Sequence, residues 1–277
     1  MSLYESCLKL WPVPYEIKNI VTEFGSTQII ISGETDKPPL VLLHGASATS
    51  LMWVTNVETL SKKFRIYAID TLGDIGRSKP IKPFKNKRDA ANWLVQVLDL
   101  LEIDKAYYAG MSYGSFLGLN LAVLNPERVL KLIMISPTET FISLNITFWI
   151  RFIKLMLFPT KRARLEFLKW SNGNKEIVEN DFTEMIFIGM RYGKYYISPM
   201  MKTIFSASEL QKLNIEIMVL IGEDEVLVNV GKLVKRAKQI VKSIEFNIIP
   251  KTSHTLTNQE PETVNDYIIE FLERKLK

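Results

Sequence analysis

Cysteine and histidine are scarce in this 277-residue chain, which has one cysteine and two histidines. A single cysteine, Cys7, excludes a disulfide within the chain, and neither it nor His44 and His254 occurs at a spacing typical of zinc ligands. We therefore expect no metal and no organic cofactor. Because disulfides belong to oxidising compartments, their exclusion favours a cytoplasmic protein.

Long apolar runs are missing as well. Residues 1–14 lack the basic start and the apolar core of a signal peptide, which agrees with the cytoplasmic expectation. The longest apolar stretch, residues 141–158, is interrupted by Arg151 and Lys154 and is a poor candidate for a membrane span. Stable membrane insertion is therefore not expected.

Neither sign of charge is in large excess, because the formal net charge is only +5. The cations are scattered or form small clusters, and no cluster is combined with aromatic residues in a nucleic-acid-binding module. We expect no nucleic-acid partner. With 47% hydrophobic and 23% charged residues, the composition is that of a folded globular protein, and the length suits one domain with an insertion.

Short apolar runs alternate with segments of helical spacing along most of the chain. The runs, at residues 40–43, 65–69, 106–109, 129–135, 215–221 and 244–249, are typical of strands buried on both faces. Helical spacing occurs at residues 51–60, 89–101, 115–124, 230–241 and 261–276. This alternation predicts an α/β fold with a mostly parallel, doubly wound sheet. Residues 17–24 and 27–31 flank Gly25 and Ser26, which predicts an antiparallel hairpin at the N-terminal edge.

The alternation fails between Pro137 and about Ser208. We expect residues 138–207 to form a helical cap, inserted into a core domain of residues 1–137 and 208–277. The aromatic residues of the cap predict an apolar roof over a substrate pocket, although packing of the cap onto the sheet would use the same residues. These residues include Phe141, Phe148, Trp149, Phe152, Phe158, Phe167, Trp170, Phe182, Phe187, Tyr192, Tyr195 and Tyr196.

The strongest local motif is Gly110-Met111-Ser112-Tyr113-Gly114, which lies between a predicted strand and a predicted helix. In a nucleophile elbow, the serine occupies a sharp and strained turn in this context, and glycines on either side avoid a collision. The motif therefore predicts Ser112 as a catalytic nucleophile. The alternative is a serine that only caps the following helix.

A serine hydroxyl is a poor nucleophile and needs a base within hydrogen-bond reach, for which the chain offers only His44 and His254. His254 follows the last predicted strand and agrees with the chain order serine, acid, histidine, so we predict it as the base. The alternative is a loop histidine with local hydrogen bonds.

The acid that orients the base should follow the strand at residues 215–221, where Glu223, Asp224 and Glu225 are the candidates. Asp70 precedes the serine, and we expect it to be structural.

An oxyanion hole needs two preorganised donors. We expect the backbone N–H groups of Ala46 and Tyr113 to supply them, because one follows the nucleophile and the other lies in the loop after an early strand. His44 and Gly45 belong to this oxyanion loop, and the His44 side chain is expected to brace it. A buried histidine without a catalytic link is the alternative.

These features together resemble the α/β-hydrolase family and are most similar to bacterial carboxylesterases. The resemblance rests on residues 42–46, 70–78, 110–114, 222–226 and 253–254 and spans nearly the whole chain apart from the cap. It implies the α/β-hydrolase fold and a triad of Ser112, Glu225 and His254. Glu225 is chosen because the family usually places its acid three residues after the glycine at 222, and Asp224 is the runner-up.

The resemblance implies a serine esterase that cleaves small carboxylic esters with an apolar acyl or alcohol part, as a monomer or homodimer. Lipases, carbon–carbon bond hydrolases, peptidases and acyltransferases use the same triad, and the fold does not choose among them. A binding or signalling protein with low turnover on the same scaffold is a further alternative. So is a lipase whose basic amphipathic stretch, residues 149–168, lies on a membrane surface.

Overall fold

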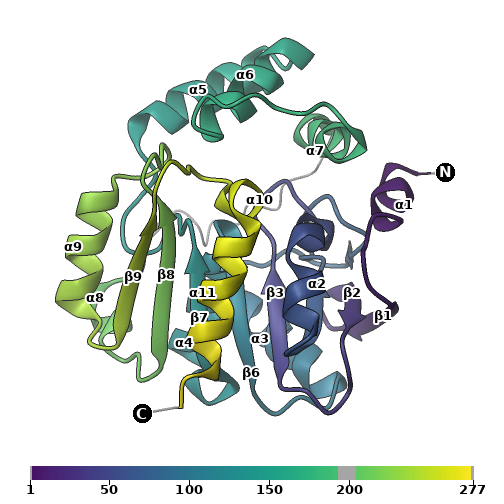
Figure 1. Ribbon diagram of the computed structural model, residues 1–277, viewed down its shortest axis with the longest axis vertical. Coiled ribbons are helices and arrows are strands. Elements are labelled where there is room, and N and C mark those ends of the chain that lie inside the picture. The colour runs from purple at the N-terminus through teal and green to yellow at the C-terminus, as the bar shows by residue number, and fades with distance from the viewer. Residues whose placement is uncertain (1, 193–203, 276–277) are drawn as a thin grey trace.

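A mixed β-sheet forms the centre of the protein, which was obtained as a computed structural model that describes residues 2–192 and 204–275. In these residues the sheet has nine strands in the order β1-β2-β4-β3-β6-β7-β8-β9, with β5 paired to β2 (Figure 1). The strands are β1 (Tyr15–Thr22), β2 (Gly25–Ser32), β3 (Pro39–Leu43), β4 (Arg65–Ile69), β5 (Lys79–Pro80), β6 (Ala106–Met111), β7 (Val129–Ile135), β8 (Glu216–Gly222) and β9 (Ile244–Ile249).

The pairing confirms the predicted mostly parallel sheet with an antiparallel N-terminal edge. Six strands, β4, β3, β6, β7, β8 and β9, run parallel to one another, whereas β2 is antiparallel to β1, β4 and β5. The predicted hairpin turn was placed too late, because Glu23 and Phe24 form it and β2 already begins at Gly25. Gly25 is needed for another reason: its φ is +140°, and a Cβ there would lie 2.2 Å from the carbonyl oxygen of Lys79 in β5.

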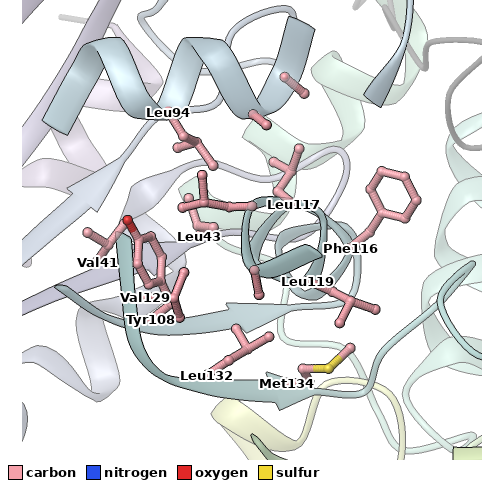
Figure 2. Packing of buried hydrophobic residues seen from close by; sticks show 14 of the residues in the cluster. Val41, Leu43, Leu94, Tyr108, Phe116, Leu117, Leu119, Val129, Leu132 and Met134 are labelled. Atoms are coloured by element: carbon pink, nitrogen blue, oxygen red, sulfur yellow. The ribbon is translucent and has the colours of Figure 1, made fainter. Parts of the chain in front are cut away.

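Helices cover both faces of the sheet, and alternate strand residues point to opposite faces. Val41 and Leu43 of β3 join a core with α3 (Lys87–Leu100), α4 (Tyr113–Leu124) and α9 (Val230–Ile240), part of which Figure 2 shows. Leu40 and Leu42 join the opposite core with η1 (Ser50–Thr55), α2 (Val57–Ser61) and α11 (Pro261–Glu273). Short helices η2 (Pro126–Arg128), α8 (Ala207–Leu210) and α10 (Leu256–Gln259) lie in connections. This two-layered cover confirms the doubly wound arrangement.

Two features near the N-terminus were not predicted from the sequence. The segment expected as one helix at residues 51–60 is divided into η1 and α2. Helix α1 (Leu3–Leu8) is too short to be stable alone, but the hydroxyl of Tyr4 donates a 3.0 Å hydrogen bond to the buried carboxylate of Asp70. Asp70 also accepts hydrogen bonds from the backbone N–H and the hydroxyl of Ser50, so its contacts are those of a structural residue.

Helices α5 (Ile146–Leu157), α6 (Lys161–Ser171) and α7 (Asp181–Tyr192) lie above one end of the sheet (Figure 1). They fall in the segment predicted as a cap, whose boundaries at 138 and 207 stay a prediction. Aromatic rings pack α5 against α6, since the ring centres of Phe148 and Phe167 are 6.0 Å apart. Tyr195 and Tyr196 lie outside the described residues. No described helix is both long and apolar enough to cross a bilayer.

Candidate active site

Ser112 lies in a strained turn between β6 and α4. Its φ of +51° and ψ of −109° are unfavourable for a residue with a side chain, and its N–H donates a 2.8 Å hydrogen bond to the carbonyl of Ile135 at the end of β7. A Cβ on Gly110 would lie 2.3 Å from the backbone of Gly114, and one on Gly114 would lie 2.1 Å from the carbonyl oxygen of Leu43. The two glycines therefore allow the tight packing that holds Ser112 at the sheet edge.

We expect Gly114→Ala to destabilise the protein by about 3 kcal/mol or more, because the added methyl group must displace the rigid backbone of β3. The matched control is Gly231→Ala in the first turn of α9, where a Cβ would meet its nearest neighbour at an ordinary 3.6 Å. There, alanine should raise the free energy of unfolding by about 0.5 kcal/mol. Urea denaturation of both variants and the parent measures the difference, and a neutral Gly114→Ala would contradict the described packing.

His254 and Glu225 meet across the ends of β8 and β9. The Nδ1–H of His254 donates a 2.9 Å hydrogen bond to Oε2 of Glu225, whose side chain has no exposed area. The other carboxylate oxygen accepts a 2.8 Å hydrogen bond from the N–H of Leu227. Asp224, the runner-up for the acid, is exposed, and its N–H is bonded to the carbonyl of Thr252. The structure thus brings Glu225, and not Asp224, to the histidine.

The pKa of Glu225 is set by two opposing effects, burial on one side and the interactions with His254 and other donors on the other. Burial alone would raise the pKa of Glu225, but the interaction with His254 and the donated hydrogen bonds outweigh it and lower the pKa below its ordinary value. Glu225 is therefore ionised at neutral pH. In the neutral form of His254, an ionised partner holds the ring proton on Nδ1 and leaves Nε2 free to accept one.

The loop after β3 passes over the nucleophile. A Cβ built on Gly45 would lie 3.6 Å from the Cβ of Ser112. The buried His44 uses both of its ring nitrogens to hold this loop: Nε2 accepts from the N–H of Thr71 at 2.9 Å, and Nδ1–H donates to the carbonyl of Gly45 at 2.8 Å. With both nitrogens occupied, His44 braces the loop and has no free nitrogen for use as a base.

Ala46 and Tyr113 lie at the two ends predicted for an oxyanion hole. Ala46 is exposed, and Tyr113 begins α4. Among the described residues, neither amide donates a hydrogen bond to another protein group. The next residue along the loop, Ser47, has a φ of +63° and donates its N–H to both carboxylate oxygens of Asp74 at 3.1 Å. Asp74 thus fixes the turn that carries the Ala46 amide.

Asp74 and Thr138 were not identified from the sequence. Burial raises the pKa of Asp74, and its negative charge adds to the burial that raises the pKa of the Tyr113 hydroxyl. Thr138 is buried just after β7 and lies 3.3 Å from the hydroxyl oxygen of Ser112. Among the described residues, the Ser112 hydroxyl is hydrogen-bonded to Thr138 and makes no hydrogen bond with His254. No sequence motif marks either residue, because each acts through a contact between distant loops.

The loop that carries His254 is tied to the segment predicted as a cap. The amide of Gln259 donates to the side-chain oxygen of Asn172 at 2.6 Å, and its own oxygen accepts from the N–H of Ser253 at 2.8 Å. Before α5, the N–H of Asn145 donates to the carbonyl of Leu227 at 2.8 Å, two residues after Glu225. The segment that contains α5 and α6 is therefore attached to the loops of both His254 and Glu225.

Comparison with known proteins agrees with the fold described above. A family model described as "alpha/beta hydrolase fold" matches residues 38–177. A protein of Bacillus subtilis (strain 168) named "Uncharacterized carboxylesterase nap" is 34% identical over 97% of this chain and 90% of its own length. "Carboxylesterase YbfK" from the same strain is 31% identical over 97% of this chain and 92% of its own length.

Solved structures extend the similarity to three dimensions. The crystal structure of naproxen esterase (carboxylesterase NP) from Bacillus subtilis superposes with a TM-score of 0.92 at 33% identity, covering 98% of this chain and 96% of the other. That of carboxylesterase CesB (YbfK) from the same organism has a TM-score of 0.92 at 31% identity and the same coverage. The likeness therefore includes the segment predicted as a cap as well as the sheet.

Proposed function

Because the chain belongs to the α/β-hydrolase fold family, we propose that it is a serine hydrolase that cleaves carboxylic esters with an apolar acyl or alcohol part. The observation that carries the proposal is the buried contact between Glu225 and His254 at the same sheet edge as the strained Ser112. This combination supplies a nucleophile, a base and the group that orients the base. Relatives named carboxylesterases, which match over nearly the full chain, support the choice of an ester bond.

In the proposed reaction, the hydroxyl oxygen of Ser112 attacks the ester carbonyl carbon, and Nε2 of His254 takes the hydroxyl proton. The imidazolium formed in this way is stabilised by the Glu225 carboxylate at 2.9 Å. It then gives the proton to the departing alcohol oxygen as the carbon–oxygen bond breaks. Water attacks the acyl-enzyme by the same steps, and the acid leaves with Ser112 restored.

The negative charge of each tetrahedral intermediate is assigned to the N–H groups of Ala46 and Tyr113. Neither amide has another acceptor among the described residues, so both are available to the oxyanion. Preorganisation is supplied by His44 and Asp74, which hold the loop before and after Ala46. The hydroxyl of Thr138 positions that of Ser112 until substrate binding brings the nucleophile and His254 within hydrogen-bond distance.

A substrate panel tests the proposed bond type. Matched ester, thioester and amide substrates with the same apolar acyl group should be hydrolysed in the order expected of an esterase, with the amide slowest. Labelling with a fluorophosphonate probe should accompany turnover, because the probe reports an activated serine. A protein that takes the probe but cleaves only the amide would contradict the ester assignment, and a protein that does neither would be a binding scaffold.

A further inference from the structure

Helix α5 is apolar on two sides, and the residues that the structure describes cover only one of them. On the covered side, Leu155 is buried and the ring of Phe148 contacts that of Phe167 in α6. On the other side, large apolar residues are exposed, from 43% for Trp149 to 72% for Ile146. We call this the outer face of α5; it consists of Ile146, Trp149, Ile150, Ile153, Met156 and Leu157.

The spacing shows that the outer face is one continuous surface. Residues at i, i+3, i+4, i+7, i+10 and i+11 lie on the same side of a helix, and these are the intervals between Ile146 and Leu157. Phe158, which follows the helix, is also exposed and extends the surface. Single exposed apolar residues are common, but a contiguous apolar surface marks an interaction site. In Figure 1, α5 lies with α6 at the end of the molecule opposite the C-terminus.

Positive charge lies along one flank of the outer face. Residues 140–165 contain no Asp or Glu. In α6, Lys161 pairs with Glu179, Arg162 pairs with Glu166 and Arg164 is buried, so the exposed charge beside the outer face comes from Arg151 and Lys154 of α5. Thr147, Arg151 and Lys154 follow one another at helical spacing along the flank of α5, and all three are exposed. Lys154 makes no ion pair with the part of the chain that the structure describes. An apolar face that includes tryptophan and has a cationic flank is typical of a helix that lies in a lipid–water interface.

We propose that the outer face of α5 docks onto an anionic lipid surface. The apolar residues would enter the acyl boundary, and Arg151 and Lys154 would meet the anionic headgroups. A second copy of the chain fits less well, because antiparallel pairing of two α5 helices across a twofold axis would place their cationic flanks side by side. The binding does not depend on Ser112, but docking would hold the cap, and with it the loops of Glu225 and His254, close to apolar esters in the lipid.

The exposed apolar surface does not continue into α6. Pro159 and Thr160 separate the helices, and the N-cap of α6 is Thr160, whose side chain accepts from the N–H of Ala163 at 3.1 Å. In α6, Trp170 is buried, and Arg164 lies over the ring of Phe187. The amphipathic stretch expected at residues 149–168 therefore is not one helix. Its exposed apolar part begins earlier, at Ile146, and ends at Phe158.

Vesicle sedimentation tests the proposal with the Ser112→Ala protein, so that lipid turnover cannot interfere. We expect binding to phosphatidylcholine vesicles that contain phosphatidylglycerol, weaker binding without phosphatidylglycerol, and weakening by salt. The double variant Ile150→Ser/Ile153→Ser should lower the partition coefficient at least about tenfold, because both side chains lose their apolar burial. The matched control, Ile81→Ser/Leu100→Ser, removes two similarly exposed apolar residues outside the cap and should bind as the parent does.

Two further measurements make the result decisive. The emission of Trp149 should shift to the blue on binding, and the shift should be lost in Trp149→Phe. Lys154→Gln should reduce the dependence of binding on phosphatidylglycerol.

Equal binding by the parent and the Ile150/Ile153 double variant, or no binding by the parent, would overturn the proposal. Sedimentation velocity that shows a dimer dissociated by the double variant would also overturn it, in favour of self-association. Hydrolysis of a short monomeric ester by the double variant tests the catalytic proposal separately.

Discussion

Ser112→Ala should lower the kcat for ester hydrolysis by about 10⁶-fold and abolish labelling by a fluorophosphonate. The hydroxyl oxygen is the atom that forms the acyl-enzyme, and alanine removes it without adding volume to the tight turn between Gly110 and Gly114. The backbone hydrogen bond from residue 112 to Ile135 does not involve the side chain and should persist. The variant is therefore expected to fold, with the loss confined to chemistry.

The matched control is Ser243→Ala. Ser243 is exposed and precedes β9, whereas His254 follows that strand, so the two lie toward opposite ends of it. This variant should retain the kcat, the KM and the labelling of the parent. Initial rates with a p-nitrophenyl ester, together with circular dichroism of both variants, provide the comparison. A Ser112→Ala protein that hydrolyses the ester at the parental rate would exclude the acyl-enzyme mechanism.

Much of the fold could be predicted because local patterns and the fold agree. The strand runs at residues 65–69, 129–135 and 244–249 coincide with β4, β7 and β9, since parallel strands buried on both faces need continuous apolar sequence. The split of η1 from α2 could not be predicted, because both parts share the helical spacing of one longer helix. Helix α1 was missed for a different reason: its contacts with Asp70 and with α7 lie far away in sequence.

In the candidate site, too, some residues could be predicted from local sequence and others depend on contacts between distant segments. Ser112 and His254 could be proposed from motif and chain order, which are local properties. The choice between Glu225 and Asp224 required the loop geometry, because neighbouring residues of a turn point in different directions. Thr138 and Asp74 approach Ser112 and Ser47 through loops of different strands, so no spacing in the sequence marks them. The outer face of α5 shows the same limit, since periodicity indicates an apolar face but not whether another element covers it.

Glu225→Gln should lower kcat by about 10⁴-fold with little change in KM, whereas Asp224→Asn should remain close to the parent. The carboxylate of Glu225 can only accept a hydrogen bond, which fixes the proton of His254 on Nδ1 and leaves Nε2 free. The amide of glutamine can donate to Nδ1 instead, and this moves the proton to Nε2, where the base is needed. Asp224 is exposed and does not contact His254, so its charge can be removed without this effect.

The pair of variants is well matched, because both exchange a carboxylate for an amide of the same size in adjacent residues of one loop. Turnover of a short ester by the two proteins, with urea denaturation to confirm folding, decides which residue is the acid. The lowered pKa of Glu225 also predicts a pH dependence. Because its carboxylate stays ionised down to a pH below the ordinary pKa of 4.5, the loss of kcat in Glu225→Gln should be present throughout the neutral range. If Asp224→Asn lost turnover and Glu225→Gln kept it, the contact at 2.9 Å would be structural and the proposed triad wrong.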